Sequence, residues 1–210
     1  MSVKRTYVTP QHTATWYPTG HRCEDMQAGD VLLVHHYHSD AAWVIRAGAW
    51  LRPSTRNYAW TNHACVAIDA THIVQEVKRG AVISDISTFD AALYCVIRVE
   101  ADAAQIDAAV EFTKWLVGSG YGFIEVIADG IDDLTGVRIA AGSYGRACCS
   151  AATCRALERM GLIPDKDPTA CQPADLAVYF DLPTQMANVA MNARGPVAAL
   201  RIAQFLDTFK

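Results

Sequence analysis

The sequence predicts an α+β domain in which helices pack against an antiparallel sheet. Short apolar runs rich in β-branched residues dominate the chain up to residue 100, and amphipathic patterns of helical period dominate the chain after it. Strands followed by helices are typical of α+β folds, whereas a regular alternation of the two would indicate a parallel sheet. The chain has 210 residues, 51% of them hydrophobic, which is enough for one sizeable core.

Charge and hydropathy exclude several classes of protein. The formal net charge is −4 and no run of Lys and Arg is present, which argues against a nucleic-acid binder. The high hydrophobic fraction excludes a disordered chain. No window approaches the ~18 uncharged apolar residues of a membrane-spanning helix, and the opening MSVKRTYVTPQHTATWYP lacks the apolar stretch of a secretory signal. We therefore expect a cytoplasmic protein without a membrane span, with release by cell lysis as a route outward.

The pattern along the chain predicts one domain preceded by an irregular extension. Residues 1–28 are polar and are interrupted by Pro10, Pro18 and Gly20, so we expect no regular structure there. Residues 29–210 contain no convincing linker, and we expect them to fold as a single domain.

Each element of the predicted domain follows from a local pattern. The β-branched apolar run after the Ala-Gly-Asp turn predicts a buried strand. A tight link between HACVAID and HIVQEV predicts an antiparallel hairpin. Gly118 and Gly161 end amphipathic patterns, and Pro173 lies in the first turn of a short one. The predicted strands are 31–34, 63–69, 72–77, 81–86 and 92–100, and the predicted helices are 39–50, 102–118, 121–136, 150–161, 173–180 and 197–209.

Cysteine and histidine usage gives no sign of a metal centre. Seven cysteines show no CxxC spacing, so we expect no structural zinc site and mostly reduced, buried thiols. His35, His36 and His38 lie near Asp40 but lack a further ligand nearby, so we expect neither a metal nor another cofactor. An odd number of cysteines leaves one thiol over, as a nucleophilic cysteine would.

Cys149 lies where the sequence GRACCSAATCRALERMG predicts the N-terminus of a helix. The positive end of a helix stabilises a thiolate and lowers the pKa of the thiol. The unpaired amides of the first helical turn can also stabilise an oxyanion. Position alone leaves open that Cys148 and Cys149 are simply buried.

His63, at the start of the predicted strand 63–69, is the candidate proton acceptor for such a thiol. The next predicted strand carries Gln75 and Glu76, and either side chain can orient the imidazole and fix its tautomer. Neighbouring residues of a strand point to opposite faces, so only one of the two can do this. A carboxylate stabilises an imidazolium better than an amide does, which favours Glu76 and keeps Gln75 as the alternative.

Six segments from residue 28 onward occur in an order shared with a known family. They are AGDVLLV, WTNHACVAID, HIVQEVKRGAV, GSGYGF, CCSAATCRALERMG and PADLAVYF. With His on one strand, an acid or amide on the next and Cys at a helix start, the chain resembles the circularly permuted papain-like hydrolases. These form the YiiX-like branch of the NlpC superfamily, which is related to lecithin:retinol acyltransferase-like proteins. The resemblance implies a permuted papain-like fold, with the nucleophile at the N-terminus of a helix.

The resemblance assigns the nucleophile to Cys149 rather than Cys148, because the family's cysteine is followed directly by serine. One departure concerns the residues after that serine. The family usually carries a Glu and then a small residue soon after the Cys-Ser pair, and this chain has Ala151 and Ala152 there.

The function that the resemblance implies is a cysteine hydrolase that cleaves an amide bond, in a peptide or a cell-wall peptide, through a thioester acyl-enzyme. Cys149 would attack the carbonyl and His63 would act as base. The candidates to line the substrate cleft are Trp60, Tyr121 and Tyr144. Two alternatives stay open: a lipid ester hydrolase or acyltransferase on the same scaffold, and a catalytically idle domain used for binding or assembly.

Overall fold

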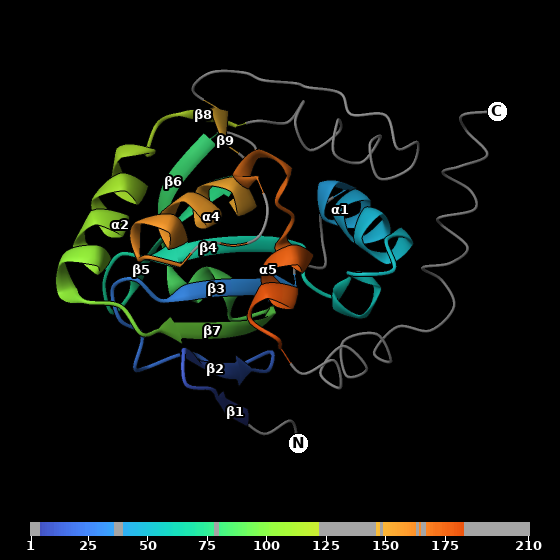
Figure 1. Cartoon of the computed structure of the whole chain (residues 1–210), viewed down its shortest axis with the longest axis horizontal. Helices are drawn as coiled ribbons and strands as arrows, with labels where there is room; N and C mark the ends of the chain where they lie inside the picture. Colours follow the sequence, from blue (N-terminus) through green and yellow to red (C-terminus); the bar gives the residue numbers. More distant parts are fainter. Residues whose placement is uncertain are drawn as a thin grey trace.

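The computed structural model describes residues 5–35, 40–77, 80–121, 146–147, 149–162, 164 and 167–182. A seven-stranded antiparallel sheet forms its centre, with the strand order β1-β2-β7-β3-β4-β5-β6 (Figure 1). The strands are β1 (Arg5–Val8), β2 (His12–Tyr17), β3 (Val31–His35), β4 (His63–Ala67), β5 (His72–Val77), β6 (Gly80–Asp85) and β7 (Leu93–Val99). The α+β class and the strands predicted after residue 30 are confirmed.

The segment 1–28, predicted to be irregular, contains two of these strands. β1 pairs with β2, and β2 pairs with β7 along its whole length. Pro10 and Pro18 lie just outside the ends of β2, so they bound the strand and do not break it. Threonines alternate with the buried Ala14 and Trp16 along β2, which turns one side of the strand toward the core.

Three α-helices lie over one face of the sheet, as Figure 1 shows: α2 (Ala103–Trp115), α4 (Cys149–Arg159) and α5 (Pro173–Tyr179). Asp102 and Gln105 form a capping box that begins α2. Gly161, in the left-handed region at φ 77°, follows the end of α4 as predicted. α1 (Asp40–Leu51) packs beside α5 through Ala49 and Ala174.

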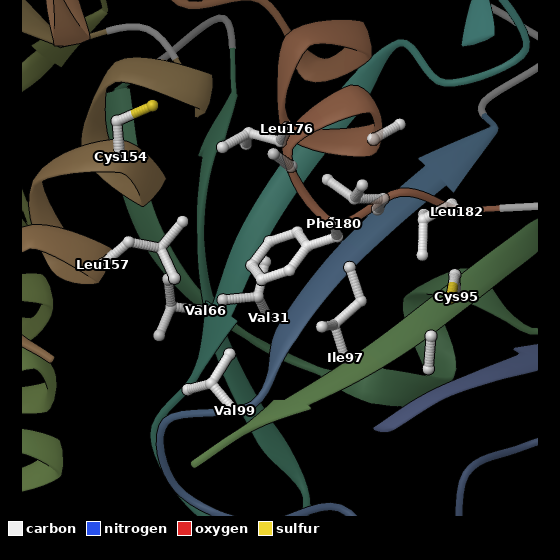
Figure 2. Close-up of a cluster of buried hydrophobic side chains, with 14 of the residues drawn as sticks. Val31, Val66, Cys95, Ile97, Val99, Cys154, Leu157, Leu176, Phe180 and Leu182 are labelled. Carbon is white, nitrogen blue, oxygen red and sulfur yellow. The ribbon is translucent and has the colours of Figure 1, made fainter. Parts of the chain in front are cut away.

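Alternation along the strands gives the sheet two faces with separate cores. The helix face is the one toward α2, α4 and α5, and its strand residues include Val31, Leu33, Ala64, Val66 and Val74. Figure 2 shows Leu157, Leu176 and Phe180 lying over Val31, Val66, Ile97 and Val99 on this face. The opposite face carries Leu32, Val34, Cys65, Ala67 and Ile73, which pack with Tyr17, Met26 and Phe89.

Two short parallel strands lead into α4. β8 (Gly120–Tyr121) follows the end of α2, and β9 (Arg146–Ala147) comes just before α4. The predicted helices 121–136 and 197–209 fall mainly or wholly outside the described residues. None of the helices in the described parts of the chain is long and apolar enough to cross a membrane.

Candidate active site

Cys149 is the first residue of α4, and the first turn of this helix is anchored by its own polar side chains. The Ser150 hydroxyl donates a hydrogen bond to the carbonyl oxygen of Cys171, which ties the turn to the segment before α5. The Thr153 hydroxyl donates to the carbonyl oxygen of Cys149 at 2.8 Å. The side chain of Cys149 is buried, with the residue 3% exposed. Because the first N–H groups of a helix lack intrahelical acceptors, this end of α4 is suited to bind negative charge.

A chain of hydrogen bonds crosses three strands and orients His63. The His63 ring nitrogen Nε2 lies 3.0 Å from Gln75 Oε1. The Gln75 amide nitrogen donates to the hydroxyl of Ser84 on β6 at 2.9 Å. Because the amide group of Gln75 is oriented by Ser84, its oxygen faces the imidazole and accepts a hydrogen bond from the Nε2–H group. The ring of Phe89 contacts the His63 ring edge-on, with 6.1 Å between centroids.

Glu76 lies on the other face of the sheet from His63. The strand pairs Cys65 with Gln75, which puts His63, Cys65 and Gln75 on one face and turns Glu76 to the helix face. Gln75 is therefore the residue that contacts the imidazole. The sequence had favoured Glu76, because a carboxylate stabilises an imidazolium better than an amide does. Burial raises the pKa of Glu76 to about 8, and its carboxylate oxygens have no hydrogen-bond partner among the described residues.

Cys65 connects the two parts of the candidate site. It lies directly opposite Gln75 and two residues after His63, on the same face of β4. Burial raises the pKa of the Cys65 thiol well above its usual range, and the electrostatic effect of Cys149 raises it further. The Cys149 thiol therefore interacts electrostatically with Cys65, the third residue of the strand that begins with His63.

The aromatic residues expected to line a cleft are placed differently from one another. Trp60 is 1% exposed and packs against Trp16 with 4.5 Å between ring centroids, so it belongs to the core on the helix face. Tyr121 is in β8, where its backbone pairs with Ala147, and its side chain is outside the described set. Tyr144 lies outside the described residues altogether.

Two participants were not singled out from the sequence. Ser84 orients the amide of Gln75. Cys65 lies opposite Gln75, and its pKa is raised by Cys149. A signal for Ser84 existed in the hairpin pattern, because the register of β5 and β6 places residues 73 and 84 opposite each other and so brings Ser84 diagonal to Gln75. Cys65 resembled an ordinary apolar strand residue.

The arrangement fits proton transfer at the other ring nitrogen of His63. With Nε2 held as a donor to Gln75, Nδ1 is the nitrogen that can accept a proton. Gln75 orients the ring without adding a charge, which differs from a carboxylate partner. A thiol at a helix N-terminus and an oriented imidazole are the groups that nucleophilic acyl chemistry requires.

Comparison of the sequence with models of known protein families found no match, and comparison with curated proteins found none either.

Proposed function

We propose that this protein is a cysteine hydrolase with a permuted papain-like fold, in which Cys149 is the nucleophile and His63 the general base. The observation that carries the proposal is the His63–Gln75–Ser84 chain of hydrogen bonds, with distances of 3.0 and 2.9 Å. Such a chain holds the imidazole in one tautomer and one orientation, as a general base requires. The first-residue position of Cys149 in α4 adds the nucleophile.

The proposed reaction cleaves an amide bond in two stages. The Cys149 thiolate attacks the carbonyl carbon after His63 takes its proton, and N–H groups of the first turn of α4 stabilise the oxyanion. His63 then gives the proton to the departing amine, and a thioester remains on Cys149. Water, which loses a proton to His63, attacks the thioester and releases the carboxylic acid. The substrate class we propose is a peptide, with cell-wall peptides as one candidate.

Cys149 and His63 must approach each other from opposite faces of the sheet. α4 packs on the helix face through Ala152 and Leu157, whereas His63 belongs to the opposite face. His63 is the first residue of β4 and is only half-buried. The thiol must therefore meet the imidazole around the end of β4, where the sheet no longer separates the two faces.

Thiol reactivity tests this pairing directly. We would label the native protein with iodoacetamide between pH 5 and 8 and map the modified cysteines by mass spectrometry. We expect Cys149 to react first at pH 6, because a nearby imidazolium and the helix terminus favour the thiolate. His63→Ala is expected to slow labelling at pH 6 by about tenfold, the effect of a rise of one pKa unit in the thiol.

Matched variants separate the proposed pair from general effects. His72→Ala removes an exposed histidine of β5 and is expected to leave labelling unchanged. Gln75→Ala should slow labelling less than His63→Ala, because it loosens the imidazole but keeps it. If all cysteines react slowly and His63→Ala has no effect, the pairing is wrong, and a binding or assembly role takes its place.

A further inference from the structure

Glu76 is a carboxyl group that the fold buries at a cost. The residue is 4% exposed, and neither carboxylate oxygen has a hydrogen-bond partner among the described residues. An unpaired buried polar group is expensive, and an unpaired buried charge is much more so. Natural proteins contain few such groups, and many of those that occur belong to functional sites.

Strand register places Glu76 beneath the first turns of α4. Glu76 lies directly opposite Ala81 on β6, two residues after Val74 on the same face. Val74, Ala81 and Ala152 of α4 belong, with Leu116, to one small cluster of buried residues. Glu76 is thus flanked by two residues of the cluster to which α4 contributes Ala152.

Cys149 belongs to the same stripe of α4 as Ala152. Residues three apart on a helix share a face, and both side chains are buried. From Ala152 the helix runs toward Leu157, which lies beside Val66 of β4 (Figure 2). Since α4 packs mainly on β4 and also on β5, and Leu157 lies toward its other end, Cys149 lies at the end of the helix beyond Ala152, on the side of β5, which carries Glu76.

Few other titratable groups face Glu76 from the surrounding elements. The helix-face residues of β4 are Ala64 and Val66, and the partner on β6 is alanine. On α4 the second thiol, Cys154, belongs to the cluster around Leu157. The charged side chains of α4, Arg155, Glu158 and Arg159, are exposed, and Arg159 lies over the Phe112 ring. On the neighbouring elements, exposed His72 pairs with Asp69 and exposed Lys114 with Glu111. Lys78 and Arg79 lie outside the described residues.

We propose that Glu76 is a positioning residue for Cys149, and that the two groups form a coupled pair carrying one negative charge between them. This inference rests on the proposed function, because it concerns the nucleophile of that reaction. Two like charges in one poorly solvated place oppose each other, so ionisation of either group holds the proton on the other. Burial, which raises the pKa of Glu76 to about 8, brings its titration into the range of a thiol.

The test measures both titrations in the full-length protein. Labelling of Cys149 with iodoacetamide against pH gives the thiol midpoint in the wild type, Glu76→Gln and Glu76→Leu. Carbon-13 NMR of labelled glutamate carboxyls, with the Glu76 signal assigned by its loss in Glu76→Gln, gives the carboxyl midpoint in the wild type and Cys149→Ser. We expect whichever group ionises second in the wild type to titrate about one pH unit lower once its partner is removed.

Controls on the same helix set the baseline. Glu158→Gln removes an exposed carboxyl near the C-terminal end of α4, and Cys154→Ser removes a buried thiol from the middle of the helix. Neither substitution should move the titration midpoint of Cys149 or Glu76 by more than a small fraction of the shift of about one pH unit expected for the pair. Glu76→Leu keeps the thiol half of the test available if Glu76→Gln fails to fold.

The possible outcomes separate this inference from the proposed function. If neither midpoint moves, the coupled pair does not exist, whatever His63→Ala does to the labelling. If a midpoint moves but His63→Ala leaves Cys149 labelling unchanged, the pair stands and the Cys149–His63 assignment fails. A merely structural Glu76 would change stability and leave both midpoints in place.

Discussion

At the scale of single residues, Glu76 and Gln75 show how one position along a strand changes the chemistry of a side chain. Gln75 exchanges hydrogen bonds with His63 and Ser84 on one face of the sheet. Glu76 points to the other face, and its carboxyl is buried without a described partner. Burial of Gln75 costs little because both its amide oxygen and its amide nitrogen are hydrogen-bonded. Burial of Glu76 is tolerated only while its carboxyl group is neutral.

The neutral state of Glu76 predicts how folding stability depends on pH. The pKa is about 8 in the folded protein and about 4.3 in an unfolded chain. Below pH 4 the carboxyl is protonated in both states. Between about pH 4 and 8 the unfolded chain loses the proton first, so the folded state loses about 5 kcal/mol as the pH rises. Glu76→Gln should abolish this loss, and urea unfolding at pH 5 and pH 8 measures it.

The control for this prediction is Glu100→Gln, which changes an exposed carboxyl. It should leave the slope of stability against pH as it is in the wild type. A Glu76→Gln protein whose stability falls with pH as steeply as the wild type would mean that Glu76 is charged in the fold.

At the scale of elements, the turn before β3 depends on a glycine for two reasons. Gly29 has a φ of 86°, in the left-handed region that side chains disfavour. A Cβ at this residue would also lie 3.0 Å from Ile106 Cγ2 on α2. The turn therefore sets how closely α2 approaches the start of β3, the central strand of the sheet.

Two alanine variants separate these reasons. Gly20 has a φ of 85°, but a Cβ there would meet no atom within 4 Å. We expect Gly20→Ala to cost about 1 kcal/mol from backbone conformation alone. Gly29→Ala should cost about 1 to 3 kcal/mol more, because Ile106 must move. Equal losses in urea unfolding would show that α2 does not press on the turn.

Most elements from residue 29 onward were predictable because their local patterns agree with their tertiary environment. The 63–69 and 72–77 strands are buried and β-branched, and glycine ends α4 where the amphipathic pattern stops. β2 was not predicted because the prolines on either side of it are typical of irregular chain. Its two core residues, Ala14 and Trp16, are too few to give a clear alternating apolar pattern. The partner of His63 was uncertain because the choice between Gln75 and Glu76 depends on strand register, which a one-residue slip would reverse.

At the scale of the whole molecule, an ion pair between the half-buried Arg98 and the buried Asp30 joins distant parts of the chain. Arg98 on β7 donates two hydrogen bonds to the Asp30 carboxylate, at 3.0 and 2.8 Å, and a third to the carbonyl oxygen of Asp25. Burial raises the pKa of Asp30 in spite of the opposing effect of Arg98. Without the arginine, Asp30 would be a buried charge with much less compensation.

Arg98→Leu should therefore destabilise the protein by about 3 kcal/mol at pH 7. The loss should shrink at pH 4, because a protonated Asp30 needs no counter-charge. Arg22→Leu breaks the exposed pair with Asp90 and should have little effect on stability at either pH, because exposed ion pairs are screened by solvent. Thermal unfolding of the three proteins at both pH values decides this, and equal effects of the two substitutions would contradict the prediction.

The strand order also determines when the sheet can form during synthesis. β7 separates β2 from β3, so neither of these strands has its central neighbour until residue 99 has left the ribosome. At about 5 to 20 residues per second, the wait between the end of β3 and the start of β7 lasts roughly 3 to 12 seconds. During that time β3, with all five residues buried in the finished fold, is an apolar strand with an open edge. The nascent chain is thus most exposed to aggregation before its middle is complete, and a chaperone that binds short apolar segments would find its target at residues 31–35.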